Sequence, residues 1–296
     1  MTMVSNFFSH LGVAAVKSLR FVPLGMRRTL AGLLARLMWV LLSDRRHVAL
    51  TNLRLCFPEM AEDERERIAR GVFRNLACAT LDHGVLWAGS HEDVARLIRY
   101  EGLDEVKQHL GEPILIISPH FLGLDAAGIG LCQHARGCSI YQRQTNPVWD
   151  KAAYEGRTRF GDPVLLAKTG HGQDMKAIVR LMREGLPFYY LPDMDHGRSN
   201  SIFVPFFGVP AATVAMASRL ARVTRARVYM CVAEITPEGY TVHLTEPWKD
   251  FPSSDPEADT LRVTQELERW VRRFPDQYLW THRRFKTRPE GEPSVY

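Results

Sequence analysis

Two polar side chains follow the apolar segment at residues 113–118 (PILIIS) and could act together in proton transfer. His120 and Asp125 are the ends of the sequence HFLGLD, with four residues between them. If the carboxylate of Asp125 reaches the imidazole of His120, it fixes the imidazole tautomer and stabilises the imidazolium, which makes His120 a general base near neutral pH. No serine or cysteine occupies an obvious nucleophile position. The proton would therefore come from a substrate hydroxyl.

The spacing of this pair is weak evidence when it stands alone. Eleven histidines and 33 acidic residues in 296 positions give about one H-x4-D match by chance. The context adds weight, because ligands of open α/β sheets bind beyond the carboxyl ends of strands, where His120 lies. Positions i and i+5 of a regular helix point about 140° apart, so the side chains meet only across an irregular turn, which Gly123 allows. The alternative is a satisfied histidine at a helix N-terminus, with Asp125 facing solvent.

A second polar cluster follows the predicted strand at residues 187–191. Asp193 and Asp195 come directly after this strand, so they should lie at the same sheet edge as His120. Two carboxylates in a D-x-D pattern could hold a divalent cation against a diphosphate, as in nucleotide-sugar transferases. They could instead orient neighbouring arginines beside an apolar slot, or form a plain polar turn. The residues alone leave these interpretations open.

Arginines that could bind anionic groups occur in two places. Arg157 and Arg159 lie at the end of the predicted helix 147–159, where a solvated helix face and phosphate binding are both reasonable interpretations. Arg283 and Arg284 belong to the segment THRRFKTR, which contains no acidic residue. Such spaced cations beside aromatic residues suit a phosphorylated lipid or the acidic face of a carrier protein.

Alternating predicted strands and helices position these side chains. Short apolar runs predict strands at residues 113–118, 138–142, 163–167, 187–191, 227–235 and 240–245. Helical spacing predicts helices within 61–100 and at 123–135, 147–159, 172–184, 212–224 and 257–273. The segment TPEG between the last two strands is typical of a hairpin turn. The pattern indicates an α/β fold with a mostly parallel central sheet and helices on both faces.

The first 60 residues differ from the rest in charge and in hydropathy. They hold eight basic and two acidic residues, whereas the remaining 236 residues are close to neutral. A membrane-spanning helix needs about 20 mostly apolar residues, and the best window, residues 1–19, holds Lys17 and several polar side chains. We predict apolar, basic helices that lie in the membrane interface and contact anionic headgroups. The alternatives are a core-packing helix pair with solvated arginines and a single tilted span.

Length and composition limit the remaining possibilities. We expect two parts, an N-terminal membrane-associating part at residues 1–60 and an α/β domain at 61–296, without a cleavable signal peptide. Five cysteines without a CxxC pair indicate a reducing compartment rather than a disulfide framework or zinc knuckle. The absence of Walker A, GxGxxG, GxSxG and HExxH motifs disfavours nucleotide-binding, serine-hydrolase and zinc-protease classes. No nucleic-acid partner is expected, because the strongest basic density coincides with apolar helices.

Three segments make the chain resemble the late acyltransferases of lipid A biosynthesis, the lauroyl and myristoyl transferases of the wider lysophospholipid acyltransferase-like group. They are SPHFLGLD, LPDMDHGRSNSIFVPFFGVPA and PDQYLWTHRRFKTRPEGEPSVY. The resemblance extends from about Asn52 to the C-terminus. His120 and Asp125 match the family's H-x4-(D/E) motif, with aspartate where many relatives carry glutamate. Arg157 matches the arginine of its G-R-x-R stretch, and Asp193 matches the aspartate of P-D-x-D.

The resemblance implies an enzyme that moves an acyl chain from acyl carrier protein to a hydroxyl of a Kdo-lipid IV(A)-type precursor. It places that reaction among the lipids of the Gram-negative inner membrane, at the cytoplasmic face, without cofactor or metal ion. His120 would take the hydroxyl proton while Asp125 steadies the imidazolium, and no acyl-enzyme would form. The expected substrate-binding residues are Arg157, Arg159, Asp193, Asp195, Arg283 and Arg284. The alternatives are a membrane-associated, metal-dependent glycosyltransferase that uses the two aspartates and a non-catalytic lipid-binding protein.

Overall fold

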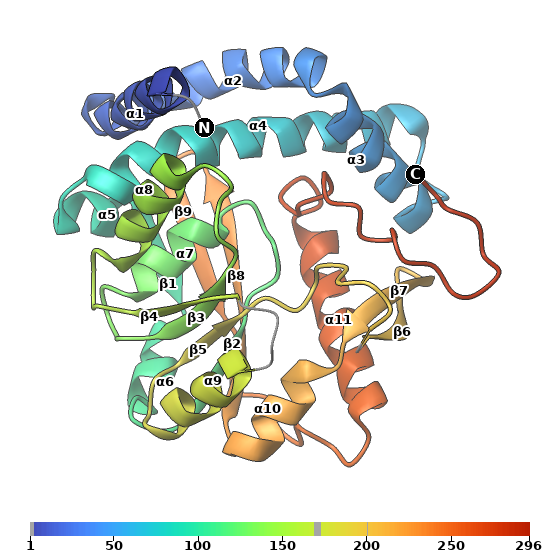
Figure 1. Cartoon of the computed structure of the whole chain (residues 1–296). Coiled ribbons are helices and arrows are strands. Elements are labelled where there is room, and N and C mark those ends of the chain that lie inside the picture. The colour runs from blue at the N-terminus through green and yellow to red at the C-terminus, as the bar shows by residue number, and fades with distance from the viewer. Residues whose placement is uncertain (1–2, 169–172, 200) are drawn as a thin grey trace.

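The computed structural model of the chain describes residues 3–168, 173–199 and 201–296. Its strands are β1 (Ile98–Glu101), β2 (Ile114–Ile117), β3 (Cys138–Tyr141), β4 (Val164–Ala167), β5 (Phe188–Tyr190), β6 (Ser201–Phe206), β7 (Val209–Val214), β8 (Arg227–Thr236) and β9 (Gly239–Leu244). Seven of them form the central sheet, in the order β1-β9-β8-β2-β5-β3-β4, and β6 pairs with β7 in a separate hairpin (Figure 1). The central sheet is parallel apart from the antiparallel β8–β9 pair.

The helices are α1 (Met3–Ser18), α2 (Leu24–Leu41), α3 (Ser43–Cys56), α4 (Glu62–Ala88), α5 (His91–Leu97), α6 (Leu103–Gln108), α7 (Leu124–Leu131), α8 (Pro147–Thr158), α9 (Gln173–Arg183), α10 (Met216–Thr224) and α11 (Pro256–Arg273), with a 3-10 turn at Leu19–Phe21. The sequence specifies several starts locally. Asn146 and Asp255 accept backbone N–H groups at the first turns of α8 and α11, and each is followed by proline, which suits the first helical position.

Strand β2 lies between two hydrophobic cores, one on each face of the sheet, and contributes side chains to both. Leu115 and Ile117 pack in the core that includes residues of α9, α10 and α11, whereas Ile114 and Ile116 pack in the core that includes residues of α4 and α7. Alternate side chains of a strand point to opposite faces, so a strand buried on both faces must be apolar throughout. The continuous ILII run meets this requirement. The predicted α/β class and mostly parallel sheet are therefore confirmed.

The six predicted strands correspond to β2, β3, β4, β5, β8 and β9, and the three strands β1, β6 and β7 were not predicted. The stretch 61–100 ends in strand β1, whose sequence IRYE contains two charged residues and therefore no apolar run. The helix expected at 212–224 begins only at Met216, because the preceding residues form β7. Pro205 and Pro210 face each other in the β6–β7 hairpin. Proline has no backbone N–H to donate, and such a residue is tolerated in an edge strand. The helix expected at 172–184 corresponds to α9, and its residue 172 lies outside the described residues.

Helices α1 and α2 lie above α4 along one side of the molecule (Figure 1). A buried ionic cluster attaches α2 to the α/β part. Asp82 on α4 accepts Arg27 Nε at 2.8 Å, Arg28 Nη1 at 2.7 Å and the hydroxyl of Tyr240 on β9 at 2.9 Å. These donors compensate a carboxylate that is fully buried. The cluster spans the domain boundary predicted at residue 60, and that boundary stays a prediction.

The surface of the N-terminal helices is unusually apolar. Of the 14 large apolar side chains that are exposed among the described residues, 11 lie between residues 7 and 42. On α2 the buried Ala31 and Ala35 face the protein, while Leu30, Leu33 and Leu37 are exposed on the other side of the helix. Within residues 3–168, 173–199 and 201–296, no helix is long and apolar enough to span a membrane.

Candidate active site

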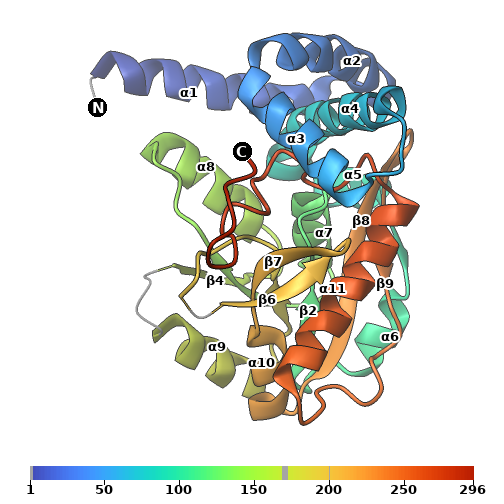
Figure 2. The same cartoon turned by 90° about the vertical axis from the view of Figure 1, so that its right-hand side faces the viewer.

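His120 lies in a loop that follows β2 and is held in place by the C-terminal segment. The backbone N–H of Leu279 donates to the carbonyl of His120 at 2.9 Å, and the N–H of Leu122 donates to the carbonyl of Gln277 at 2.8 Å. Phe121 and Tyr278 form an isolated β-bridge between these pairs. The loop is thus paired with residues that come more than 150 positions later. The C-terminal segment crosses the protein beside α11 and β6–β7 in Figure 2.

Asp193 orients the imidazole of His120. Nδ1 of His120 lies 2.7 Å from Oδ1 of Asp193, and the backbone N–H of His120 donates to Oδ2 at 2.9 Å. The hydroxyl of Tyr278 donates to the same Oδ2 at 3.0 Å. Burial would raise the pKa of Asp193, but the charge and hydrogen bonds of His120 outweigh burial and lower this pKa to about 2. Because an ionised carboxylate only accepts hydrogen bonds, Nδ1 of His120 carries the proton.

The expected pairing of Asp125 with His120 was wrong. No hydrogen bond joins these two side chains in the described part of the chain, and Asp193 occupies the position that Asp125 was predicted to fill. The reason is local: α7 begins at Leu124, so Asp125 already follows helical geometry and points toward α4 and α8.

The side chain of Tyr189 lies between the two ends of the His120 loop. The hydroxyl of Tyr189 accepts from Ser118 at 2.6 Å and lies 3.3 Å from the carbonyl of Leu124. It therefore connects the two ends of the His120 loop.

Asp125 belongs to a second charged cluster, with Arg157 of α8 and His83 of α4. Arg157 donates to Oδ1 of Asp125 through Nε at 3.1 Å and through Nη2 at 2.9 Å, and Nη2 is also 3.0 Å from Oδ2. Nε2 of His83 lies 3.1 Å from Oδ2. Burial would raise the pKa of Asp125, but the charge of Arg157 and the hydrogen bond of His83 lower it well below its usual value. The carboxylate is therefore charged at neutral pH.

The D-x-D aspartates act as internal anchors. Asp193 holds His120, while Asp195 accepts the backbone N–H and hydroxyl of Thr287, each at 2.7 Å, and the N–H of Gly197 at 2.9 Å. These contacts fasten the C-terminal segment to the loop after β5. Among the residues that the structure describes, no three histidine, cysteine or acidic side chains converge as metal ligands would.

The predicted arginines occupy different environments. Arg159 donates to the carbonyls of Val85, Leu86 and Gly89 and so satisfies the C-terminal end of α4. Arg284 is buried and donates to the carbonyl of Ala212 and the hydroxyl of Thr213 in β7. Arg283 is exposed, with its guanidinium over the ring of Tyr296. The structure thus gives Arg159 and Arg284 structural contacts, and their substrate-binding role stays a prediction.

The sequence reasoning did not single out His83, Tyr189, Tyr278 or His282 as site residues. His282 accepts the backbone N–H of Asp195 through Nε2 at 3.3 Å. Burial, together with the neighbouring charges of His120 and Arg284, lowers its pKa to about 4. His282 is therefore neutral at pH 7. Tyr278 lies in the segment PDQYLWTHRRFKTRPEGEPSVY, which carries part of the family resemblance, but its contact with Asp193 depends on tertiary structure.

The fold and the site together define a class of protein. A histidine anchored by a buried carboxylate, at the carboxyl end of a central parallel strand, is an arrangement that can support acid–base chemistry on an α/β scaffold. The family model described as bacterial lipid A biosynthesis acyltransferase matches residues 1–287. The chain belongs to this family, as the resemblance of its motifs predicts. It is therefore an acyltransferase of lipid A biosynthesis.

Curated relatives agree with this assignment. The chain is 30% identical over 293 residues to a lipid A biosynthesis acyltransferase of Haemophilus influenzae, covering 97% of this chain and 93% of that protein. It is 32% identical over 250 residues to the lipid A biosynthesis lauroyltransferase of Escherichia coli, covering 83% and 80%. It is 31% identical over 291 residues to the myristoyltransferase of the same organism, covering 97% and 89%. The glycosyltransferase alternative receives no support from these matches.

Proposed function

We propose that this enzyme transfers a fatty acyl chain from acyl carrier protein to a hydroxyl of a Kdo-lipid IV(A)-type precursor, with His120 as general base. The observation that carries the proposal is the different surroundings of the two ring nitrogens of His120. Its Nδ1 donates to the buried carboxylate of Asp193, whose side chain is only 2% exposed. Its Nε2 has no hydrogen-bond partner among the described residues, and the side chain of His120 is 17% exposed. Nε2 is therefore available to take a proton from a substrate.

The proton path follows from this geometry. Nε2 of His120 takes the proton of the acceptor hydroxyl while the hydroxyl oxygen forms a bond to the thioester carbonyl carbon. The tetrahedral intermediate then collapses, the carbon–sulfur bond breaks, and the imidazolium returns the proton to the leaving thiolate. Asp193 stabilises the imidazolium between these steps, so no covalent acyl-enzyme is needed. General-base assistance of this kind contributes roughly 100- to 10,000-fold to the rate.

Cationic side chains of α8 and of the segments after β4 and α11 suit anionic substrates. Arg157 is partly exposed beside Asp125, and Lys168, Lys286 and Arg283 are exposed. Carrier proteins with an acidic face and lipid phosphates are both attracted by such cations. The protein relatives named lauroyl-, palmitoleoyl- and myristoyltransferases use different chains. We therefore propose the class of donor without a chain length.

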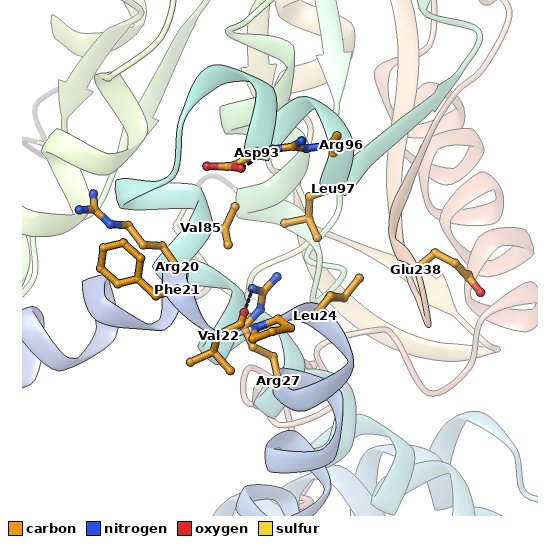
Figure 3. A pocket seen from close by; sticks show the side chains of 11 residues that line it. Arg20, Phe21, Val22, Leu24, Arg27, Val85, Asp93, Arg96, Leu97 and Glu238 are labelled. Carbon is orange, nitrogen blue, oxygen red and sulfur yellow. Dashed lines mark hydrogen bonds and ion pairs between the residues drawn. The ribbon is translucent and has the colours of Figure 1, made fainter.

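We further propose that α1 and α2 lie in the cytoplasmic face of the inner membrane. The 11 exposed apolar side chains of residues 7–42 support this location, because water-exposed patches of this kind mark interaction surfaces. Where α1 and α2 meet, Phe21 is 74% exposed beside a pocket of about 300 Å³ (Figure 3). Arg20 and Arg96 line this pocket, and such cations attract anionic lipid headgroups.

A direct assay tests the proposed function. The purified full chain is incubated with acyl carrier proteins that carry different acyl chains and with tetraacylated Kdo-lipid A, and products are identified by mass spectrometry. We expect a mass gain of one acyl group with at least one donor. His120→Ala should lower the rate by at least about 100-fold. The proposal fails if no donor gives a mass gain, or if the His120→Ala variant is as active as the wild type.

A further inference from the structure

We propose that His83 is a positioning residue for acyl transfer, which acts through Asp125 to hold the guanidinium of Arg157 ready for an anionic oxygen of the substrate or intermediate. This inference rests on the proposed function. Its basis is the three-residue cluster that α4, α7 and α8 build beside the His120 loop. His83 itself carries no recognisable motif in the sequence and contacts neither His120 nor Asp193 in the described structure.

The hydrogen bonds of Asp125 leave the roles of its neighbours unambiguous. An ionised carboxylate accepts hydrogen bonds and donates none, so Nε2 of His83 must carry a proton at the 3.1 Å contact. Arg157 uses Nε and Nη2 on the other side of the same carboxylate. Asp125 is therefore held from two helices at once. If either contact is lost, the carboxylate can rotate and carry the guanidinium with it.

Arg157 is the member of the cluster that can bind a ligand. Nε and Nη2 of its guanidinium are directed to Asp125, whereas Nη1 has no hydrogen-bond partner in the described part of the chain. The side chain is 31% exposed. The charge of Asp125 raises the pKa of Arg157, so the guanidinium is permanently positive. A fixed cation with one unused N–H edge is suited to a phosphate, a carboxylate or a developing oxyanion.

Close packing of α4 and α8 fixes the imidazole of His83. Its ring meets the ring of Trp87 edge to face, with 4.7 Å between centroids. A Cβ atom at Gly156 would lie 2.3 Å from Cδ1 of Trp87, so the absence of a side chain at this position allows α8 to approach. The next residue of α8 is Arg157. The packing therefore sets the spacing of His83 and Arg157, and His83 is oriented by Trp87 on one side and Asp125 on the other.

A matched pair of amide variants separates a positioning role from simple packing. In His83→Gln, the amide nitrogen can reach the position of Nε2 and donate to Asp125. In His83→Asn, the amide is one methylene shorter and cannot. We expect His83→Asn to lower kcat/KM of acyl transfer about 10-fold and His83→Gln to remain within about 3-fold of the wild type, as the loss or retention of one charge-assisted hydrogen bond predicts.

A double-mutant cycle with Arg157→Gln shows whether His83 acts through the guanidinium. Once the guanidinium is absent, His83→Asn should cause no further loss of kcat/KM. His134→Asn is the control, because His134 also meets an aromatic ring edge to face, at 4.9 Å from Tyr100, but has no carboxylate partner in the hydrogen bonds described. This control should keep wild-type activity. Thermal unfolding verifies that each variant is folded, and His83→Leu replaces His83→Asn if the latter is not.

The outcomes of these measurements are distinct. Equal activities of His83→Gln and His83→Asn would overturn the proposal. It would also be overturned if His83→Asn lowered kcat/KM as much in the Arg157→Gln background as in the wild type. A His134→Asn variant that loses as much as His83→Asn would show that only general packing is disturbed. If the wild type itself transfers no acyl group from any donor, the proposed function fails, which is a separate result from failure of the His83 inference.

Discussion

Replacement of Asp193 by asparagine tests the assignment of this residue to His120 most directly. The carboxylate accepts three hydrogen bonds, from Nδ1 and the backbone N–H of His120 and from Tyr278. An asparagine offers one oxygen and one NH2 group. If the NH2 group faces Nδ1, the imidazole must carry its proton on Nε2 and cannot act as a base. If the NH2 group faces the backbone N–H of His120 instead, two hydrogen-bond donors face each other and that hydrogen bond is lost.

The expected loss of activity is large in either orientation. The same carboxylate-to-amide change in the serine-protease triad lowers kcat roughly 10,000-fold, and we expect Asp193→Asn to lower kcat by about 1,000- to 10,000-fold here. KM should change far less, because Asp193 is buried and does not face substrate. The measurement is the initial rate of acyl transfer over a range of pH. Asp125→Asn is the comparison, since it should weaken catalysis through Arg157 while the pH dependence of the base remains.

The same variant has a consequence for stability. The pKa of Asp193 is about 2 in the folded protein and about 3.9 in an unfolded chain. This lowered pKa contributes roughly 2–3 kcal/mol of stability, fully present above pH 4 and lost as the pH falls toward 2. The Asp193→Asn variant should lack this acid-dependent loss in urea unfolding curves. The assignment of Asp193 to His120 would be refuted by two results together. They are a near wild-type kcat of the Asp193→Asn enzyme, and loss of activity with an altered pKa of the base in the Asp125→Asn enzyme.

Three further predictions concern the ion cluster, the membrane surface and metals. Asp82→Asn should lower the free energy of unfolding by about 3–5 kcal/mol because it leaves buried guanidiniums uncompensated, whereas the exposed control Asp104→Asn should change it little; urea unfolding measures both. Leu33→Gln with Leu37→Gln should reduce binding to anionic phospholipid vesicles at least about 10-fold in sedimentation, and Val223→Gln on α10 should not. EDTA should leave acyl transfer unchanged, and an EDTA loss reversed by Mg²⁺ would contradict the anchor roles of the two aspartates.

The fold was predictable where the sequence carries a strong period or a continuous apolar run. β2 and residues 228–233 of β8 are buried on both faces, and both stretches are apolar without interruption. The β6–β7 hairpin could not be predicted in this way. It lies outside the central sheet, and a proline such as Pro205 within an apolar run argues against a strand. Strand β1 is as long as β2, but its residues IRYE include Arg99 and Glu101 and so form no continuous apolar run.

The site was predictable in its residue types more than in its pairings. His120, Asp125, Arg157 and Asp193 were all identified, but their partners were not. A spacing of five residues suggested that His120 and Asp125 pair, whereas the real partner of His120 lies 73 residues away in sequence. Such contacts are set by strand order: β2 and β5 are neighbours in the sheet, so the loops that follow them meet at one edge. The position of Asp193 directly after a strand correctly predicted that it lies at the same sheet edge as His120, but sequence spacing contains no information about which strands are neighbours.

The division of the H-x4-D motif between two clusters gives a physical reason for aspartate at position 125. If this residue had to reach His120, its shorter side chain would be a handicap relative to glutamate. Instead it contacts Arg157 and His83, which approach from α8 and α4 and come within 3.1 Å of the carboxylate. His120 depends on Asp193 and on the C-terminal segment. The base and the candidate anion-binding arginine are thus each held by their own carboxylate, so a change of either acid should affect one function without removing the other.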